Sequence, residues 1–185
     1  MLEEMNRDAT QRMARCVAGL RDHYRKMRTG RANTGLLEGI KVEYYGTEVP
    51  LNQVANVAVE DARTLAVTPW DKSAVSAVEK AILKSDLGLT PNTAGQVIRL
   101  PLPAMNEERR RELTKVARHE AENARVAVRA VRRDLMNELK EMLKEKLISE
   151  DDDHRSQDEI QKLTDRHVHD IDAVLAEKEK ELLQV

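Results

Sequence analysis

The sequence is poor in aromatic residues, which make up 2% of its 185 positions, and it contains no phenylalanine. Its apolar positions are Leu, Val, Ala, Met and Ile, which suit packing between helices better than an aromatic-centred β core. A single cysteine, Cys16, excludes an internal disulfide and is typical of a reducing compartment. No apolar run reaches the roughly 20 residues that span a bilayer. We therefore expect a helix-rich cytoplasmic protein with no membrane partner.

The sequence also lacks the patterns of common catalytic and metal sites. The stretch from Gly30 to Gly35 is not a phosphate-binding loop, because its GK[ST] element is missing. His167 and His169 point apart on a helix, and His167 falls on an apolar stripe, which favours an interface histidine over a metal ligand. The acidic run Glu150–Asp153 is interpreted as a solvated helix start. We predict no metal, no cofactor and no catalytic residue, in a protein that is not an enzyme.

Apolar residues recur at helical spacing in three long segments, residues 2–28, 107–147 and 150–183. Asn106 is the predicted N-cap of the second helix and Ser149 that of the third. The first and third segments share an 11-residue rhythm of spacings, which gives a nearly straight packing seam. The three stripes predict an elongated antiparallel three-helix bundle. Their predicted core positions are Leu2, Met5, Ala9, Met13, Cys16, Leu20, Tyr24 and Met27; Leu113, Ala117, Ala121, Ala124, Val128, Val131, Leu135, Leu139 and Met142; and Ile160, Leu163, His167, Ile171, Val174, Lys178 and Leu182.

Residues 31–104 have a different pattern. Residues 40–45 alternate as a strand before a turn at Gly46, and residues 54–59, 65–68 and 96–100 are further strand candidates. Residues 73–85 have the spacing of a short amphipathic helix. We predict an α+β fold, in which residues 1–30 and 105–185 form the bundle and residues 31–104 form a small inserted β/α domain. Two chain connections then join the domains, which restricts their relative motion to that of a hinge.

Basic side chains gather on one face of the middle long helix, although the chain has a net charge of only −2. Residues 109–133 contain nine lysines and arginines against three acidic residues, whereas residues 134–185 are acidic on balance. At about 100° per residue, Arg125, Arg129 and Arg132 fall within about 60° of one another, and Arg133 is adjacent. This line lies roughly 100° from the apolar stripe, so packing does not need these guanidinium groups. We predict that the four arginines bind RNA phosphates.

The kind of RNA and the class of protein follow from the same composition. Proteins that read single-stranded RNA stack its bases on aromatic side chains, and the helical segments offer only Tyr24. A grip on the phosphates and shape of folded RNA is therefore expected. Two other classes stay open on these patterns, a coiled-coil adaptor or chaperone that binds protein clients and a hydrolase housed in residues 31–104. An adaptor would expose apolar side chains at the tip of the bundle, but the predicted tip is the acidic run Glu150–Asp153. A hydrolase is not favoured either, because the inserted segment has no His or Cys.

Five stretches resemble the ribosome recycling factor family, occur in the family's order and extend over essentially the whole chain. They are Met27-Arg28-Thr29-Gly30-Arg31-Ala32, Val42-Glu43-Tyr44-Tyr45-Gly46, Ser85-Asp86-Leu87-Gly88-Leu89, Ala124–Arg129 with Val131–Asp134, and Ile148–Asp152. The resemblance implies an L-shaped, monomeric molecule with a flexible elbow between the rod and the inserted domain. It also implies that the rod lies on the large ribosomal subunit after termination, where elongation factor G with GTP splits the subunits.

The resemblance also implies roles for particular residues. Arg129, Arg132 and Arg133 match the family's arginines that face the 23S rRNA, and Arg125 lies on the same line. Ala130 departs from the asparagine associated with that position. Arg28, Thr29, Gly30 and Arg31 match the family's elbow. Pro103 and Ala104 lie in the second chain connection between the two domains.

Overall fold

A computed structural model of the chain describes residues 1–184. The chain divides into two compact units, one made of Met1–Tyr24 with Arg111–Gln184 and the other of Arg25–Arg110. The first unit is helical and the second contains all of the strands, so the α+β prediction is confirmed. None of the helices in the described part of the chain is both long enough and apolar enough to cross a membrane.

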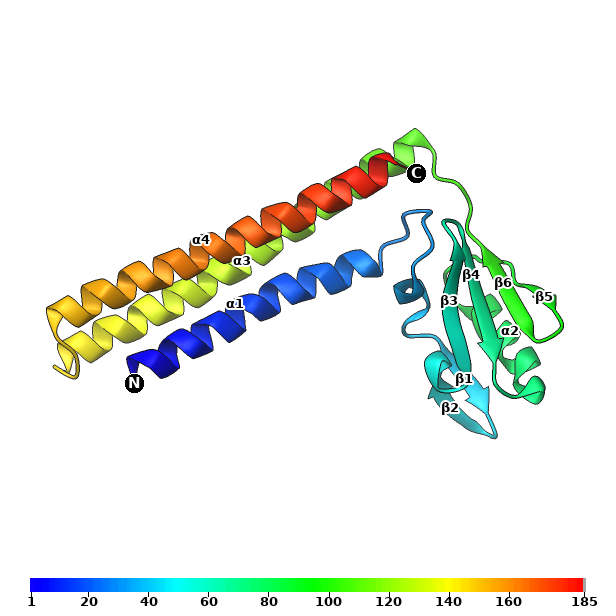
Figure 1. Ribbon diagram of the computed structural model, residues 1–185, viewed down its shortest axis with the longest axis horizontal. Helices are drawn as coiled ribbons and strands as arrows, with labels where there is room; N and C mark the ends of the chain where they lie inside the picture. Colours follow the sequence, from blue (N-terminus) through cyan, green and yellow to red (C-terminus); the bar gives the residue numbers. More distant parts are fainter. Residues whose placement is uncertain (185) are drawn as a thin grey trace. The chain divides into compact units, whose positions relative to one another are not determined.

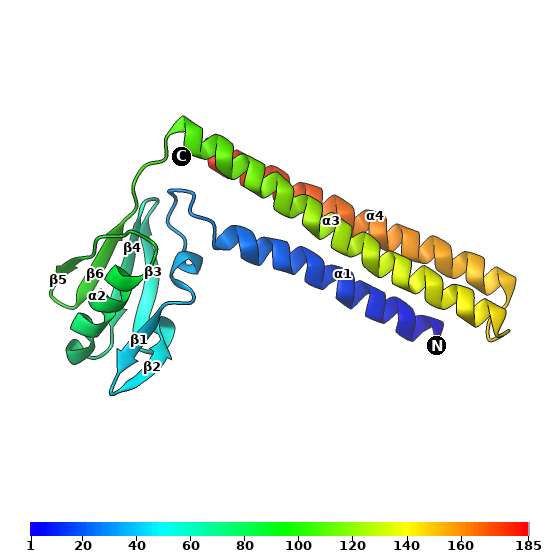
Figure 2. The ribbon, with the colours of Figure 1, turned by 180° about the vertical axis from the view of Figure 1, so that it is seen from behind.

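The first unit is built on three helices that lie side by side (Figures 1 and 2). They are α1 (Leu2–Arg25), α3 (Glu107–Lys144) and α4 (Glu150–Leu183). Helix α3 runs antiparallel to the other two (Figure 1). With 38 residues, α3 extends for about 57 Å at 1.5 Å per residue.

The predicted N-caps are confirmed. The Asn106 side chain accepts a hydrogen bond from the Arg109 amide at 2.8 Å. Ser149 forms a capping box with Asp152, in which each side chain accepts from the other residue's backbone N–H. These bonds satisfy amides that a helix start leaves without intrahelical partners.

Two helices end earlier than predicted. Helix α1 stops at Arg25 instead of residue 28, and α3 stops at Lys144 instead of residue 147. At the end of α3, Lys146 has a left-handed backbone (φ 57°), and the Leu147 amide donates to the Met142 carbonyl at 2.9 Å. This is a Schellman motif formed without glycine, so the usual sequence mark of a helix end is missing.

The apolar stripes form the bundle core with four departures from prediction. Val17 is buried in place of Cys16, and Thr164 is buried in place of Leu163, while Leu2 and Met142 are only half-buried. The Cys16 thiol donates a hydrogen bond to the Arg12 carbonyl at 3.3 Å, and burial raises the pKa of that thiol. Each departure moves the packing line by one residue or shortens it by one turn at an end, which spacing alone does not resolve.

A buried polar cluster holds the end of α1. The Tyr24 hydroxyl donates to the Ala117 carbonyl of α3 at 2.5 Å, and the Lys178 ammonium of α4 donates to the Tyr24 carbonyl at 3.0 Å. Lys178 also pairs with Glu181 at 3.3 Å. The ammonium therefore satisfies a carbonyl in the last turn of α1, where the helix dipole favours a cation.

Tyr24 is expected to make the protein lose stability in alkali. Burial raises the pKa of Tyr24 to about 12. Below pH 10 tyrosine is protonated in both states, but between pH 10 and about 12 only the unfolded chain releases this proton. The free energy of unfolding should therefore fall as the pH rises through this window, by at most about 2.7 kcal/mol from this residue. Urea unfolding at several pH values measures the fall.

The Tyr24→Phe variant supplies the control for that measurement. It should lose about 1 kcal/mol at pH 8 with the hydrogen bond, and its stability should then decline less steeply than that of the unchanged chain above pH 10. Equal slopes for the two proteins would contradict the assignment.

The second unit packs an antiparallel sheet, a hairpin and a short helix around one core (Figure 1). The four-stranded sheet has the order β3-β4-β6-β5, with bounds Ala55–Asp61, Thr64–Pro69, Val97–Pro101 and Asn92–Ala94. The hairpin pairs β1 (Lys41–Tyr44) with β2 (Thr47–Pro50), and α2 extends over Val75–Lys84. Strand β5 was not predicted, because its three residues are exposed and carry no alternation.

Candidate nucleic-acid interface and inter-unit connectors

The predicted arginine line borders a groove on the surface of α3 and α4. The groove has a volume of about 750 Å³ and combines cationic, apolar and amide side chains. It is lined by Val126, Arg129, Arg132, Arg133, Met136, Asn137, Lys140, Leu143, Asp153 and Gln157. Three of the four predicted arginines therefore meet in one depression, and Lys140 adds a fourth cation.

Arg125 lies outside this groove and is held between the helices. Its side chain is 18% exposed and pairs with Asp172 of α4 at 2.6 Å and with Glu122 at 3.1 Å. Burial by itself lowers the pKa of Arg125, but the hydrogen bonds and charges of these two carboxylates raise it overall. The Arg125 guanidinium is thus permanently charged and already paired.

The three groove arginines are engaged more weakly with their own protein. Arg129 is 56% exposed and lies 3.5 Å from Glu122, near the upper limit for an ion pair. The Nε of Arg132 donates to the Gln161 amide oxygen at 2.7 Å, which orients the guanidinium without neutralising it. Arg133 is exposed on the same groove. Cations held in this way can exchange a weak contact for a phosphate oxygen.

The contribution of α4 to this surface is not predicted by the pattern of α3. Asp172 and Glu179 of α4 reach across to Arg125 and Arg118, and they add to the acidic residues of α3 itself. Sequence reasoning also missed Lys140 and the buried Asp153, whose Oδ2 accepts from the Gln157 amide at 2.8 Å. Lys140 lies two turns beyond Arg133 and would have been found by extending the same helical line.

The residues that precede the sheet form a tight, partly buried connector. Thr29 is 2% exposed, and its hydroxyl oxygen lies 3.4 Å from the Arg31 amide that donates to it. Gly30 has a φ of +77°, a conformation that glycine adopts without steric cost. Arg28 pairs with Asp86 at 3.3 Å, and both side chains are largely exposed.

The two connectors of the second unit are tied to one hairpin turn. The Ala32 amide donates to the Ala62 carbonyl at 2.7 Å, and the Leu102 amide donates to the Arg63 carbonyl at 2.7 Å. Ala62 and Arg63 form the turn between β3 and β4. Residues 28–31 and 103–104 therefore lie just outside two matched backbone clamps, where the chain leaves the sheet.

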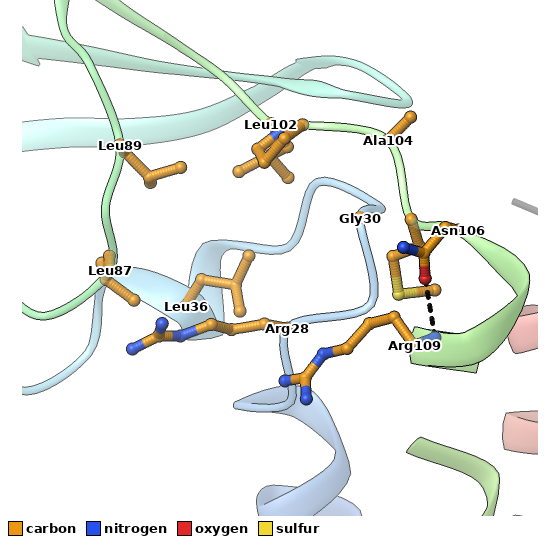
Figure 3. Close-up of a pocket in the computed structure, with 11 residues that line it drawn as sticks. Arg28, Gly30, Leu36, Leu87, Leu89, Leu102, Ala104, Asn106 and Arg109 are labelled. Atoms are coloured by element: carbon orange, nitrogen blue, oxygen red, sulfur yellow. Dashed lines mark hydrogen bonds between the residues drawn. The ribbon is translucent and has the colours of Figure 1, made fainter. Parts of the chain in front are cut away.

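A cavity of about 400 Å³ lies within the second unit beside these connectors (Figure 3). Figure 3 shows the Arg28 and Arg109 side chains reaching toward the same side of it, with the Asn106–Arg109 capping bond at its edge. Its apolar lining comes from Leu36, Leu87, Leu89 and Leu102, and Gly30, Pro103, Ala104 and Met105 complete it. Residues of both connectors, among them Gly30, Pro103 and Ala104, therefore line one cavity.

The described residues, 1–184, contain no cluster of three or more His, Cys, Asp or Glu side chains that could hold a metal ion. His167 is 4% exposed in the bundle core, and its Nδ1 lies 2.7 Å from the Leu163 carbonyl. His169 is exposed on the same helix, so the two rings are separated as predicted.

Comparison with known proteins gives one consistent result. The model of a family described as "Ribosome recycling factor" matches residues 20–183. The chain is 61% identical to the ribosome-recycling factor of Thioalkalivibrio sulfidiphilus and 55% identical to that of Legionella pneumophila strain Paris, over the full length of both proteins.

Solved structures agree with the sequence relatives. A solution structure of the ribosome recycling factor matches with a TM-score of 0.78 and 40% identity, over 100% of this chain and 98% of the other. The T. thermophilus ribosome recycling factor, in models that place it and the E. coli elongation factor G on the E. coli post-termination complex, matches with a TM-score of 0.69 and 43% identity, over 99% of both chains.

Proposed function

The chain belongs to the ribosome recycling factor family, and we propose that it binds the post-termination ribosome and, with elongation factor G and GTP, promotes dissociation of the subunits. The family match over residues 20–183 is the observation that carries this proposal. A relative 43% identical over 99% of both chains has been placed with elongation factor G on a post-termination complex, which supports the same partners. Such a factor works where ribosomes are, in the cytoplasm.

The groove on α3 and α4 is the proposed contact with the 23S rRNA of the large subunit. Arg129, Arg132, Arg133 and Lys140 bring four positive charges to one depression. Their contacts within the protein are long, single or to a neutral amide, so phosphates can replace them at little cost. Arg125 contributes positive potential and holds α4 against α3, and its own guanidinium stays with Asp172.

The proposed hinge consists of residues 28–31, Pro103 and Ala104. It joins the predicted bundle, residues 1–30 and 105–185, to the inserted domain, residues 31–104. The backbone clamps at Ala32 and Leu102 fix the sheet side of both connectors. Rotation would then be confined to the short stretches between those clamps and the helices. A GTPase that pushes on the inserted domain needs such a rotation to move the rod.

A splitting assay tests the proposed function. Light scattering of post-termination ribosomes should fall when this chain, elongation factor G and GTP are all present, because dissociated subunits scatter less than whole ribosomes. Omission of any one component should leave the signal unchanged over the same time. Full splitting without the chain, or none with it, would refute the proposal.

We further propose that the chain has no enzymatic activity of its own. A hydrolase site in residues 31–104 is the alternative to this proposal, but that segment contains no His or Cys. The stretch from Gly30 to Gly35 also lacks the GK[ST] element of a phosphate-binding loop. The purified chain incubated with GTP should therefore release no phosphate above a buffer blank. Turnover that persists through further purification, and that follows the protein across a sizing column, would overturn this proposal.

A further inference from the structure

Arginines of α3 and carboxylates of α4 form regularly spaced ion pairs across the bundle. Arg118 pairs with Glu179 at 2.7 Å, and Arg125 pairs with Asp172 at 2.6 Å. The two arginines are seven residues apart on α3, the two carboxylates are seven residues apart on α4, and these helices run antiparallel (Figure 1). Because seven residues are close to two helical turns, each further step of seven on both helices should bring another two side chains face to face.

The next position of this series pairs differently. One more step of seven residues leads to Arg132 on α3 and to Asp165 on α4, and these two side chains form no salt bridge within residues 1–184. Gln161 of α4 bridges them instead. The Nε of Arg132 donates to Oε1 of Gln161 at 2.7 Å, and Nε2 of Gln161 donates to Oδ1 of Asp165 at 2.9 Å. A neutral amide therefore replaces the direct ion pair that the rest of the series forms.

Arg132 keeps most of its hydrogen-bonding capacity as a result. A guanidinium has five N–H donors, and within residues 1–184 only the Nε–H of Arg132 is used. Arg125 differs, because its Nε and Nη2 donate to Asp172 and its Nη1 donates to Glu122. Arg132 lines the groove of α3 and α4, where its free amino groups can bind a phosphate through two parallel hydrogen bonds.

We infer that Gln161 is a positioning residue for RNA binding, because its amide holds Arg132 away from Asp165 and so keeps the guanidinium available to a phosphate. Without the amide, the spacing of the series brings a carboxylate to Arg132, as it does to Arg118 and Arg125. A hydrogen bond between two charged groups is about twice as strong as one between neutral groups, so such a pair would resist exchange for a phosphate. The inference rests on the proposed function, in which this groove contacts the 23S rRNA.

Gln161→Ala tests this role in co-sedimentation with large ribosomal subunits. Its affinity at about 0.1 M salt should be about fivefold lower, and its slope of log affinity against log salt should be about 0.7–0.9 smaller, as expected for one lost phosphate contact. Asp165→Asn added to Gln161→Ala should restore the affinity to within about twofold of the unchanged chain, because no carboxylate then faces Arg132. The control Gln11→Ala removes an exposed glutamine of α1 and should also bind within about twofold.

A second substitution at the same position keeps the test independent of lost packing. Gln161→Glu preserves the shape of the side chain and places a carboxylate directly at the Nε of Arg132, so it should weaken binding by a similar amount. Asp165→Asn should not rescue this variant, because the new carboxylate remains. Urea unfolding of each variant shows whether it is folded at the temperature of the binding assay.

The pattern of rescue separates a positioning role from a structural one. An affinity loss in Gln161→Ala that Asp165→Asn fails to rescue would mean that the amide only braces the bundle, and it would overturn the inference. Unchanged binding by Gln161→Ala, when Arg132→Gln binds more weakly, would also overturn it and leave the groove as the RNA contact. Unchanged binding by Arg132→Gln itself would refute both the proposed RNA contact at this arginine and the inference.

Discussion

A disulfide that joins the two compact units should abolish subunit splitting by elongation factor G and GTP while leaving binding to the large subunit within about threefold of the unmodified chain. In the proposed function, binding depends on the groove of α3 and α4, whose lining residues all lie in the first unit. The proposed hinge makes splitting depend on rotation through residues 28–31 and 103–104. Addition of a reducing agent should restore it in the same sample.

The chain is well suited to this experiment because it has one cysteine, Cys16, in α1. Cys16→Ala removes the competing thiol before the new pair is introduced. A control disulfide within the second unit, from Ala58→Cys and Ala66→Cys, joins direct cross-strand partners and leaves both connectors free. It should split ribosomes at the normal rate whether oxidised or reduced.

The comparison between the two oxidised proteins decides the question. If the protein with the inter-unit disulfide split ribosomes at the rate of the control protein, the rod would act as a rigid wedge and no hinge would be needed. Loss of large-subunit binding together with splitting would instead place part of the RNA contact in the second unit.

Neutralising the groove should weaken ribosome binding on the order of 100-fold at about 0.1 M salt. Each phosphate contact that is lost lowers the slope of log affinity against log salt by about 0.7–0.9. Three such contacts, removed by Arg129→Gln, Arg132→Gln and Arg133→Gln together, should lower it by about 2–3. Co-sedimentation with large subunits at graded salt gives both quantities.

Arg125→Gln provides the matched control, because the lost charge lies on the same helix but is already paired with Asp172 and Glu122. It should cost about 1 kcal/mol of folding stability, whereas each groove substitution should cost about 0.5 kcal/mol or less. Its salt slope should change little. A slope that is unchanged in the triple variant but reduced by Arg125→Gln would move the RNA contact from the groove to the Arg125 side of α3.

The sequence identified the helices because each one repeats the same physical signal many times. The α3 stripe offers nine predicted core positions, of which eight are buried, from Leu113 to Leu139. Errors of one residue, such as Cys16 for Val17, change little when the rest of the stripe agrees. Strand β5 was missed because three exposed residues at a sheet edge repeat nothing.

By itself the sequence determined the three helices, the inserted sheet segment, the line of arginines and the family, since all of these depend on local spacing or on residues in order. Only the tertiary structure decided which of these arginines are already paired with carboxylates of another helix. Asp172 lies 47 positions from Arg125 in the chain and 2.6 Å from it in space. The same is true of Asp71, whose Oδ2 accepts hydrogen bonds from two tyrosines of the β1–β2 hairpin. Helical and strand periods are set by neighbouring residues, whereas the pairing of a charge is set by whichever element packs beside it.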